Sequence, residues 1–130
     1  MFLRLFRSPF PFFGWFLLMN VLLLMPDQKL ETKALIEIPH LDKAIHFTIY
    51  CLLVFLGTMY LKLKGREGYK WLLLIIAMAH GLQIEFLQKI PSVNRDFSWF
   101  DFLFDCLGAA TGFISAHYYF KKFPELNRVK

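Results

Sequence analysis

PHLDKAIHFTIY, residues 39–50, stands at the start of a long apolar run, yet it carries an acid, a base, an imidazole and a phenol. If the run is helical, Asp42, His46 and Tyr50 follow at four-residue spacing and share one face. Ionisable side chains inside a membrane normally face the protein interior or a polar cavity, because lipid does not solvate them. The sequence therefore predicts that this face meets other polar groups within the protein.

The composition is typical of a membrane protein. Hydrophobic residues make up 57% of the 130-residue chain, above the roughly 45–50% that is usual in soluble domains. The apolar residues form blocks, and Lys and Arg lie between these blocks instead of gathering on one polar surface. The formal charge of +5 therefore does not indicate a nucleic-acid partner. The length predicts a single domain over residues 1–130.

Apolar blocks predict four transmembrane helices. Their approximate ranges are 9–25, 44–61, 71–88 and 99–120. The first block resembles a signal peptide, but no small-residue cleavage site follows it, so we interpret it as an uncleaved helix. The predicted fold is an all-α membrane protein, a four-transmembrane-helix antiparallel bundle.

The distribution of charge predicts the orientation of this bundle. Lys and Arg near the ends of the spans favour the cytoplasmic side. Ten lie in the amino-terminal segment, the second loop and the carboxy-terminal tail, against five in the other two loops. Both termini are therefore predicted to be cytoplasmic, in a multi-pass protein of the inner membrane. Eight of the ten Asp and Glu residues lie toward the predicted outer side.

Polar groups occur at the predicted outer ends of the second, third and fourth spans. They are Asp42, Lys43, His46 and Tyr50, then Glu85 and Gln88, and then Arg95, Ser98, Asp101 and Asp105. Antiparallel helices bring these ends to the same depth, so we expect the side chains to converge into one outer polar cluster.

Small residues on the fourth predicted span indicate where its polar face points. Gly108 and Gly112 lie on the same helical face as Asp101 and Asp105. A stripe of small residues lets a neighbouring helix approach closely. The acidic face is therefore predicted to point into the bundle. The two glycines could also supply the contact of a homo-oligomer.

The polar motifs follow one another in a fixed order on successive predicted helices. They read Asp42-Lys43-x-x-His46-x-x-x-Tyr50, Glu85-x-x-Gln88, Arg95-x-x-Ser98-x-x-Asp101, and Leu107-Gly108-Ala109 with Gly112. This order resembles the VanZ-like family of small bacterial membrane proteins. Asp105 departs from the pattern, because the family commonly has Asn four residues after the Asp of the last motif. The resemblance implies an integral membrane protein of the cell envelope, in a family named after a member linked to resistance to the glycopeptide teicoplanin.

Three classes of function fit these residues. The first is a binding or accessory protein whose outer cluster holds a lipid-linked or cell-wall-related headgroup, with Lys43 and Arg95 toward its phosphate. Its predicted ligand-binding residues are Asp42, Lys43, Tyr50, Gln88, Arg95, Ser98, Asp101 and Asp105. The second is a membrane-embedded hydrolase or transferase with His46 and Glu85 as catalytic acid and base. The third is a structural subunit of a membrane complex, in which the polar groups hold the helices together.

The sequence indicates no organic cofactor and leaves a divalent metal open. One imidazole and several carboxylates can ligate such an ion and activate a bound water, although a single histidine is few for zinc. Cys51 and Cys106 lie within predicted spans and show no spacing of a zinc site or a disulfide framework. His80 and His117 lie elsewhere in the spans and are interpreted as structural. The predicted partner is a membrane lipid or a lipid-linked headgroup.

Overall fold

The computed structural model describes residues 6–26 and 40–124. Within these ranges the regular elements are all helical: α2 (Phe10–Leu23), α4 (Leu41–Leu63), the 3₁₀-helix η2 (Glu67–Tyr69), α5 (Lys70–Gln88) and α6 (Trp99–Lys122). The four predicted helices are confirmed, with ends within three residues of the predicted ones. The first residues of the chain and most of the tail, which entered the orientation prediction, lie outside the described residues.

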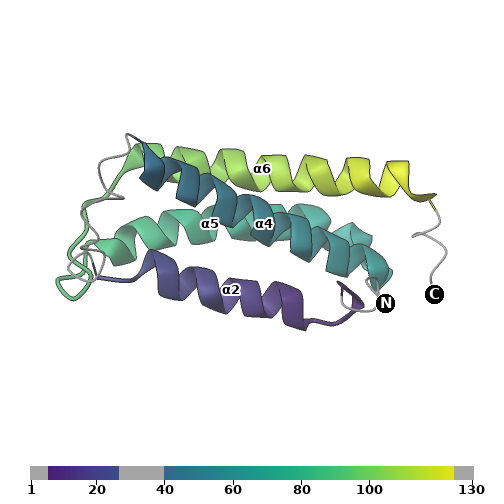
Figure 1. The fold of residues 1–130 in the computed structure, drawn as a ribbon, viewed down its shortest axis with the longest axis horizontal. Coiled ribbons are helices and arrows are strands. Elements are labelled where there is room, and N and C mark those ends of the chain that lie inside the picture. The colour runs from purple at the N-terminus through teal and green to yellow at the C-terminus, as the bar shows by residue number, and fades with distance from the viewer. Residues whose placement is uncertain (1–5, 27–39, 125–130) are drawn as a thin grey trace.

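Successive long helices run in opposite directions (Figure 1). The starts of α2 and α5 and the ends of α4 and α6 lie together at one end of the molecule. The opposite end holds the starts of α4 and α6 and the ends of α2 and α5. This second end, termed the polar end below, is therefore where the predicted polar groups of three helices meet.

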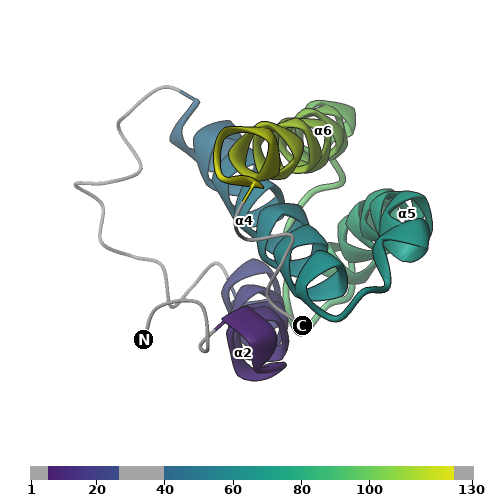
Figure 2. The same ribbon diagram turned by 90° about the vertical axis from the view of Figure 1, so that its right-hand side faces the viewer.

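Helix α4 is the centre of the bundle. In Figure 2 it lies between α6 and α2, with α5 at its side. It contacts each of the other three long helices, and its contact with α6 is the most extensive. Gly108 and Gly112 allow this contact, because a Cβ at either position would collide with the backbone oxygen of Phe47 or Cys51 on α4. Both glycines are thus buried within one chain, and association of further copies stays a prediction.

Apolar side chains fill the interior and also cover the outside. The core between α2, α4 and α5 includes Met19, Val54 and Ile84, which are at most 2% exposed. On the outside, Leu17 and Ile75 are 67% and 63% exposed. Contiguous exposed apolar surface is rare on soluble monomers and marks contact with lipid or a partner.

Two of the helices have the length and apolarity of a membrane span. They are Leu41–Leu63 and Glu67–Gln88, the second of which combines η2 and α5. Helix α2 is apolar but has only 14 residues, which correspond to about 21 Å. Helix α6 has 24 residues but carries Asp101 in its first turn and two lysines in its last. Crossing of the membrane by all four helices therefore stays a prediction.

Candidate functional site

The start of α6 directs two acids into the bundle. Ser98 is the N-cap, and its hydroxyl oxygen accepts a hydrogen bond from the backbone N–H of Asp101 at 3.2 Å. Such a cap satisfies one of the amide groups that a helix start leaves unpaired. Asp101 and Asp105 then lie one turn apart on the inner face, and both are buried. The predicted inward orientation of this acidic face is confirmed.

His46, Glu85 and Asp105 come together at the polar end, one each from α4, α5 and α6. They are termed the His–Glu–Asp cluster. His46 is 1% exposed, and the two acids are fully buried. The imidazole Nδ1 lies 2.9 Å from Asp105 Oδ1 and 3.9 Å from Glu85 Oε1. Gly81 makes room for this arrangement, since a Cβ there would lie only 3.0 Å from Asp105 Oδ2.

Several polar atoms of this cluster have no hydrogen-bond partner among the described residues. Glu85 Oε2 accepts a hydrogen bond from the backbone N–H of Ser98 at 2.8 Å. His46 Nε2, Glu85 Oε1 and Asp105 Oδ2 are buried and unpartnered. Most buried polar atoms in proteins are paired, so an unpaired group indicates strain, a functional role or a bound water or ion.

The charges of the cluster are also unbalanced. Within the described part of the chain, His46 is the only ion-pair partner of Glu85 and Asp105. Lys43 lies further out, with its Nζ 2.9 Å from Asp42 Oδ2 and 3.6 Å from Asp101 Oδ1. Two buried carboxylates thus face one imidazole, which is costly in a region of low dielectric constant.

The remaining predicted site residues differ in their burial and in whether they face the cluster. Asp42 is 44% exposed and forms a surface pair with Lys43. Arg95 is half-buried; its backbone N–H donates to Gln88 O at 3.0 Å, and its guanidinium forms no ion pair with any described residue. Gln88 is buried, and its Nε2 donates to the backbone oxygen of Leu23 at 2.9 Å. Gln88 therefore joins α5 to the end of α2 and does not face the cluster.

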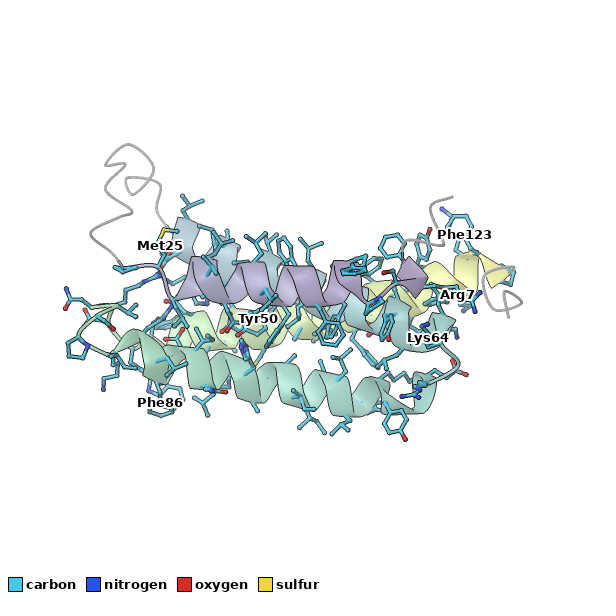
Figure 3. All side chains as sticks on the ribbon, turned by 90° about the horizontal axis from the view of Figure 1, so that it is seen from below. Arg7, Met25, Tyr50, Lys64, Phe86 and Phe123 are labelled. Carbon is cyan, nitrogen blue, oxygen red and sulfur yellow. The ribbon has the colours of Figure 1, made fainter. Side chains whose placement is uncertain are left out.

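Tyr50 belongs to a second buried polar group, which lies deeper in the bundle between α2 and α5 (Figure 3). Its hydroxyl lies 2.9 Å from His80 Nδ1, and His80 Nε2 lies 3.2 Å from Asn20 Oδ1. Asn20 Nδ2 donates to Phe16 O at 2.7 Å. Tyr50, His80 and Asn20 are termed the Tyr–His–Asn chain, and they link α4, α5 and α2.

The Tyr–His–Asn chain was not predicted from the sequence. His80 was interpreted as structural, which agrees with a hydrogen-bonding role, but no partner was predicted for it. The available signal was Asn20, an amide within an otherwise apolar block. Polar side chains in such blocks commonly hydrogen-bond across helices.

The cluster allows two kinds of chemistry. One donor atom from each of His46, Glu85 and Asp105 lies within 4.8 Å of the others, so the group could hold a metal ion. Without an ion, Asp105 orients the imidazole and leaves Nε2 free, as in general-base pairs of hydrolases. The catalytic pair predicted from the sequence was His46 with Glu85, and in the structure Asp105 lies closer to the imidazole.

The fold and the site define an all-helical protein with a buried group of ionisable side chains at one end. Comparisons of the chain with protein-family models, with curated proteins and with solved structures found no match. The VanZ-like resemblance therefore stays a prediction, and the functional argument depends on the geometry of the described residues.

Proposed function

We propose that the chain is a VanZ-like, multi-pass protein of the cytoplasmic membrane in the bacterial cell envelope, with all four long helices in the lipid. The apolar exterior supports this placement. Helix α6 has the length for a span, and its acids lie against α4 and α5 instead of lipid. The short α2 requires local thinning of the bilayer, which costs a fraction of a kcal/mol per Å.

The polar end is proposed to face outward. Basic residues gather at the opposite end, where Arg7 and Lys64 lie in Figure 3. Lys62, Lys64, Arg66, Lys70, Lys121 and Lys122 all belong to helix ends or loops at that end. Basic residues favour the cytoplasmic side, so both termini would be cytoplasmic. Cysteine labelling in intact cells tests this: a cysteine at Asn94 should react with an impermeant reagent, and one at Gly68 should not. The reverse pattern would refute the orientation.

The proposed activity is binding of a polar headgroup from a lipid-linked or cell-wall-related molecule at the polar end. The observation that carries it is the convergence of polar side chains from three helices at one end of an apolar bundle. Lys43 and Arg95 are two partly buried cations at this end. Because Arg95 forms no ion pair within the described residues, its planar fork is available to a phosphate.

Binding of a polyisoprenyl phosphate to the full chain in nanodiscs tests this proposal. Arg95→Ala should weaken binding about tenfold to a hundredfold, which corresponds to the ~1.5–3 kcal/mol of a charged hydrogen bond. Lys89→Ala is the matched control, because Lys89 is an exposed cation at the same end. Equal binding by wild type and Arg95→Ala would overturn the proposal.

The second candidate is a hydrolase or transferase that acts on the same class of lipid. The hydrogen bond between His46 Nδ1 and Asp105 Oδ1 favours it, since it leaves Nε2 as a base. Glu85→Gln keeps the shape of the side chain and should abolish the phenotype in cells if Glu85 is the acid. Teicoplanin susceptibility, which the family resemblance suggests, is one phenotype to measure. A Glu85→Gln strain with the wild-type phenotype would exclude this role.

The third candidate is a structural subunit. The bonds from Ser98 N–H to Glu85 and from Gln88 to Leu23 O favour it, because each joins two helices. Glu85→Ala should then unfold or deplete the protein. A folded Glu85→Ala protein of unchanged thermal stability would argue against this role.

A further inference from the structure

We propose that the His–Glu–Asp cluster binds one divalent transition-metal ion, with His46, Glu85 and Asp105 as its protein ligands. The three proposed ligands are buried and differ from Lys43 and Arg95, the cations proposed to contact the headgroup. Three observations carry the proposal: the separations of the donor atoms, the buried atoms without partners and the charge of the group.

The separations fit an ion in contact with all three side chains. Nδ1 of His46 faces both acids, at 2.9 Å from Asp105 Oδ1 and 3.9 Å from Glu85 Oε1. For an ion about 2.1 Å from each atom, these separations correspond to angles of roughly 90° and 135°. One donor atom from each of the three residues lies within 4.8 Å of the others. Two ligands of an ion at about 2.1 Å are at most roughly 4.2 Å apart, so a movement of roughly half an ångström brings all three atoms within reach of one ion.

The unpartnered atoms indicate that the protein leaves part of this site unsatisfied. Glu85 Oε1 is too far from His46 for a hydrogen bond, and it is fully buried. Asp105 Oδ2 is also buried without a partner and lies against Gly81, where a Cβ would be in tight contact with it. A bound ion would use the lone pairs of Glu85 Oε1, which no described residue uses, and would replace the hydrogen bond between His46 Nδ1 and Asp105 Oδ1.

The charge of the site matches a divalent cation. Two ionised acids and a neutral imidazole carry a net charge of −2, and no Lys or Arg among the described residues forms an ion pair with either acid. An ion of charge +2 neutralises the group. The alternative is two protons, one on the imidazole and one on a carboxyl group, which also gives a neutral site.

The ligand types narrow the identity of the ion. Imidazole suits zinc, iron, nickel and copper, whereas magnesium and calcium prefer oxygen ligands alone. A set of one nitrogen and two carboxylates with three protein side chains leaves further positions for water or a substrate atom. We therefore expect Zn²⁺ to bind more tightly than Mg²⁺ or Ca²⁺.

Metal titration of the full chain in mild detergent, after treatment with a chelator, tests the proposal. Isothermal titration with Zn²⁺, supported by elemental analysis after dialysis, should give one ion per chain. Glu85→Gln and Asp105→Asn should each weaken binding about 100-fold or more, since loss of a supporting group alone costs 10–100-fold. Asp96→Asn is the matched control, an exposed acid at the same end, and should bind as wild type does.

X-ray absorption at the zinc edge of the wild-type protein provides a test that needs no variant. The expected ligand set is one imidazole and oxygen atoms, without sulfur. A wild-type protein that retains less than a tenth of an equivalent of metal would overturn the proposal and favour the two-proton state. A zinc set with sulfur or several imidazoles would overturn it as well, since it would place the ion elsewhere. If Glu85→Gln and Asp105→Asn both bind zinc with the affinity of wild type, the proposal is likewise overturned.

Discussion

The molecule contains two buried polar groups in similar surroundings, and they differ in how completely their atoms are paired. In the Tyr–His–Asn chain, both nitrogens of His80, the hydroxyl of Tyr50 and both polar atoms of Asn20 have partners. In the His–Glu–Asp cluster, each of the three side chains retains a buried atom without one. Both groups join three helices, so joining helices does not by itself require unpaired atoms.

This difference separates a structural role from a functional one. A fully paired network stabilises and specifies a fold, whereas a partly paired one costs free energy unless a ligand completes it. The Tyr–His–Asn chain is also uncharged when His80 is neutral, whereas the His–Glu–Asp cluster contains two acids. The Tyr–His–Asn chain is therefore interpreted as stabilising the bundle, and the His–Glu–Asp cluster is the group for which we propose binding.

The largest expected difference between the two groups is their response to metal. Zinc at 100 times its dissociation constant should stabilise the wild-type protein by about 2.7 kcal/mol, because it binds only the folded state. Thermal unfolding followed by near-ultraviolet circular dichroism measures the shift. Glu85→Gln should lose the shift, and Tyr50→Phe should keep it. Loss of the shift in Tyr50→Phe alone would reverse the assignment of the two groups.

In the metal-free protein, a substitution in the Tyr–His–Asn chain should lower the free energy of unfolding. Tyr50→Phe removes a hydroxyl and leaves His80 Nδ1 without its partner, so it should lower the free energy of unfolding by about 1–2 kcal/mol. Chelator-treated protein and denaturant titration in detergent measure this loss. Tyr118→Phe is the control, because Tyr118 is 64% exposed. If Tyr50→Phe is as stable as wild type, the hydrogen bonds of the Tyr–His–Asn chain contribute little to folding.

Much of the fold follows from the sequence because its signals are local. Apolar blocks define each helix, and the alternation of direction places three polar motifs at one end. The inward face of α6 was predictable from Gly108 and Gly112, which allow α4 to approach. The helix boundaries and the alternation of direction require no knowledge of how α4 or α5 is rotated about its axis.

The pairing within the site depends on that rotation and was not predictable. Asp42 and Tyr50 both lie four residues from His46, yet Asp42 is exposed and Tyr50 is fully buried. Packing of α4 against the glycines of α6 turns His46 toward Asp105. The Tyr–His–Asn chain depends in addition on the docking of α2, because Asn20 reaches His80 across 60 residues of sequence.

Asp105→Asn sharpens the comparison, because it introduces the residue that the VanZ-like family commonly has here. Asparagine can still accept the hydrogen bond from His46 but carries no charge. The metal-free variant should be more stable than wild type by about 1 kcal/mol, since a poorly compensated buried charge is removed. Denaturant titration in the presence of chelator measures the change. A less stable variant would show that the acid contributes to the fold in its charged form.

The smallest effect is expected at the exposed edge of the polar end. The pair between Asp42 and Lys43 is partly exposed, and such pairs contribute roughly 0–1 kcal/mol. Asp42→Asn should therefore change stability by less than about 0.5 kcal/mol, and the difference should shrink at high salt. Lys43 also approaches Asp101 to 3.6 Å, so it keeps a carboxylate neighbour in the variant. A loss as large as that of Tyr50→Phe would place Asp42 with the buried groups, in spite of its exposure.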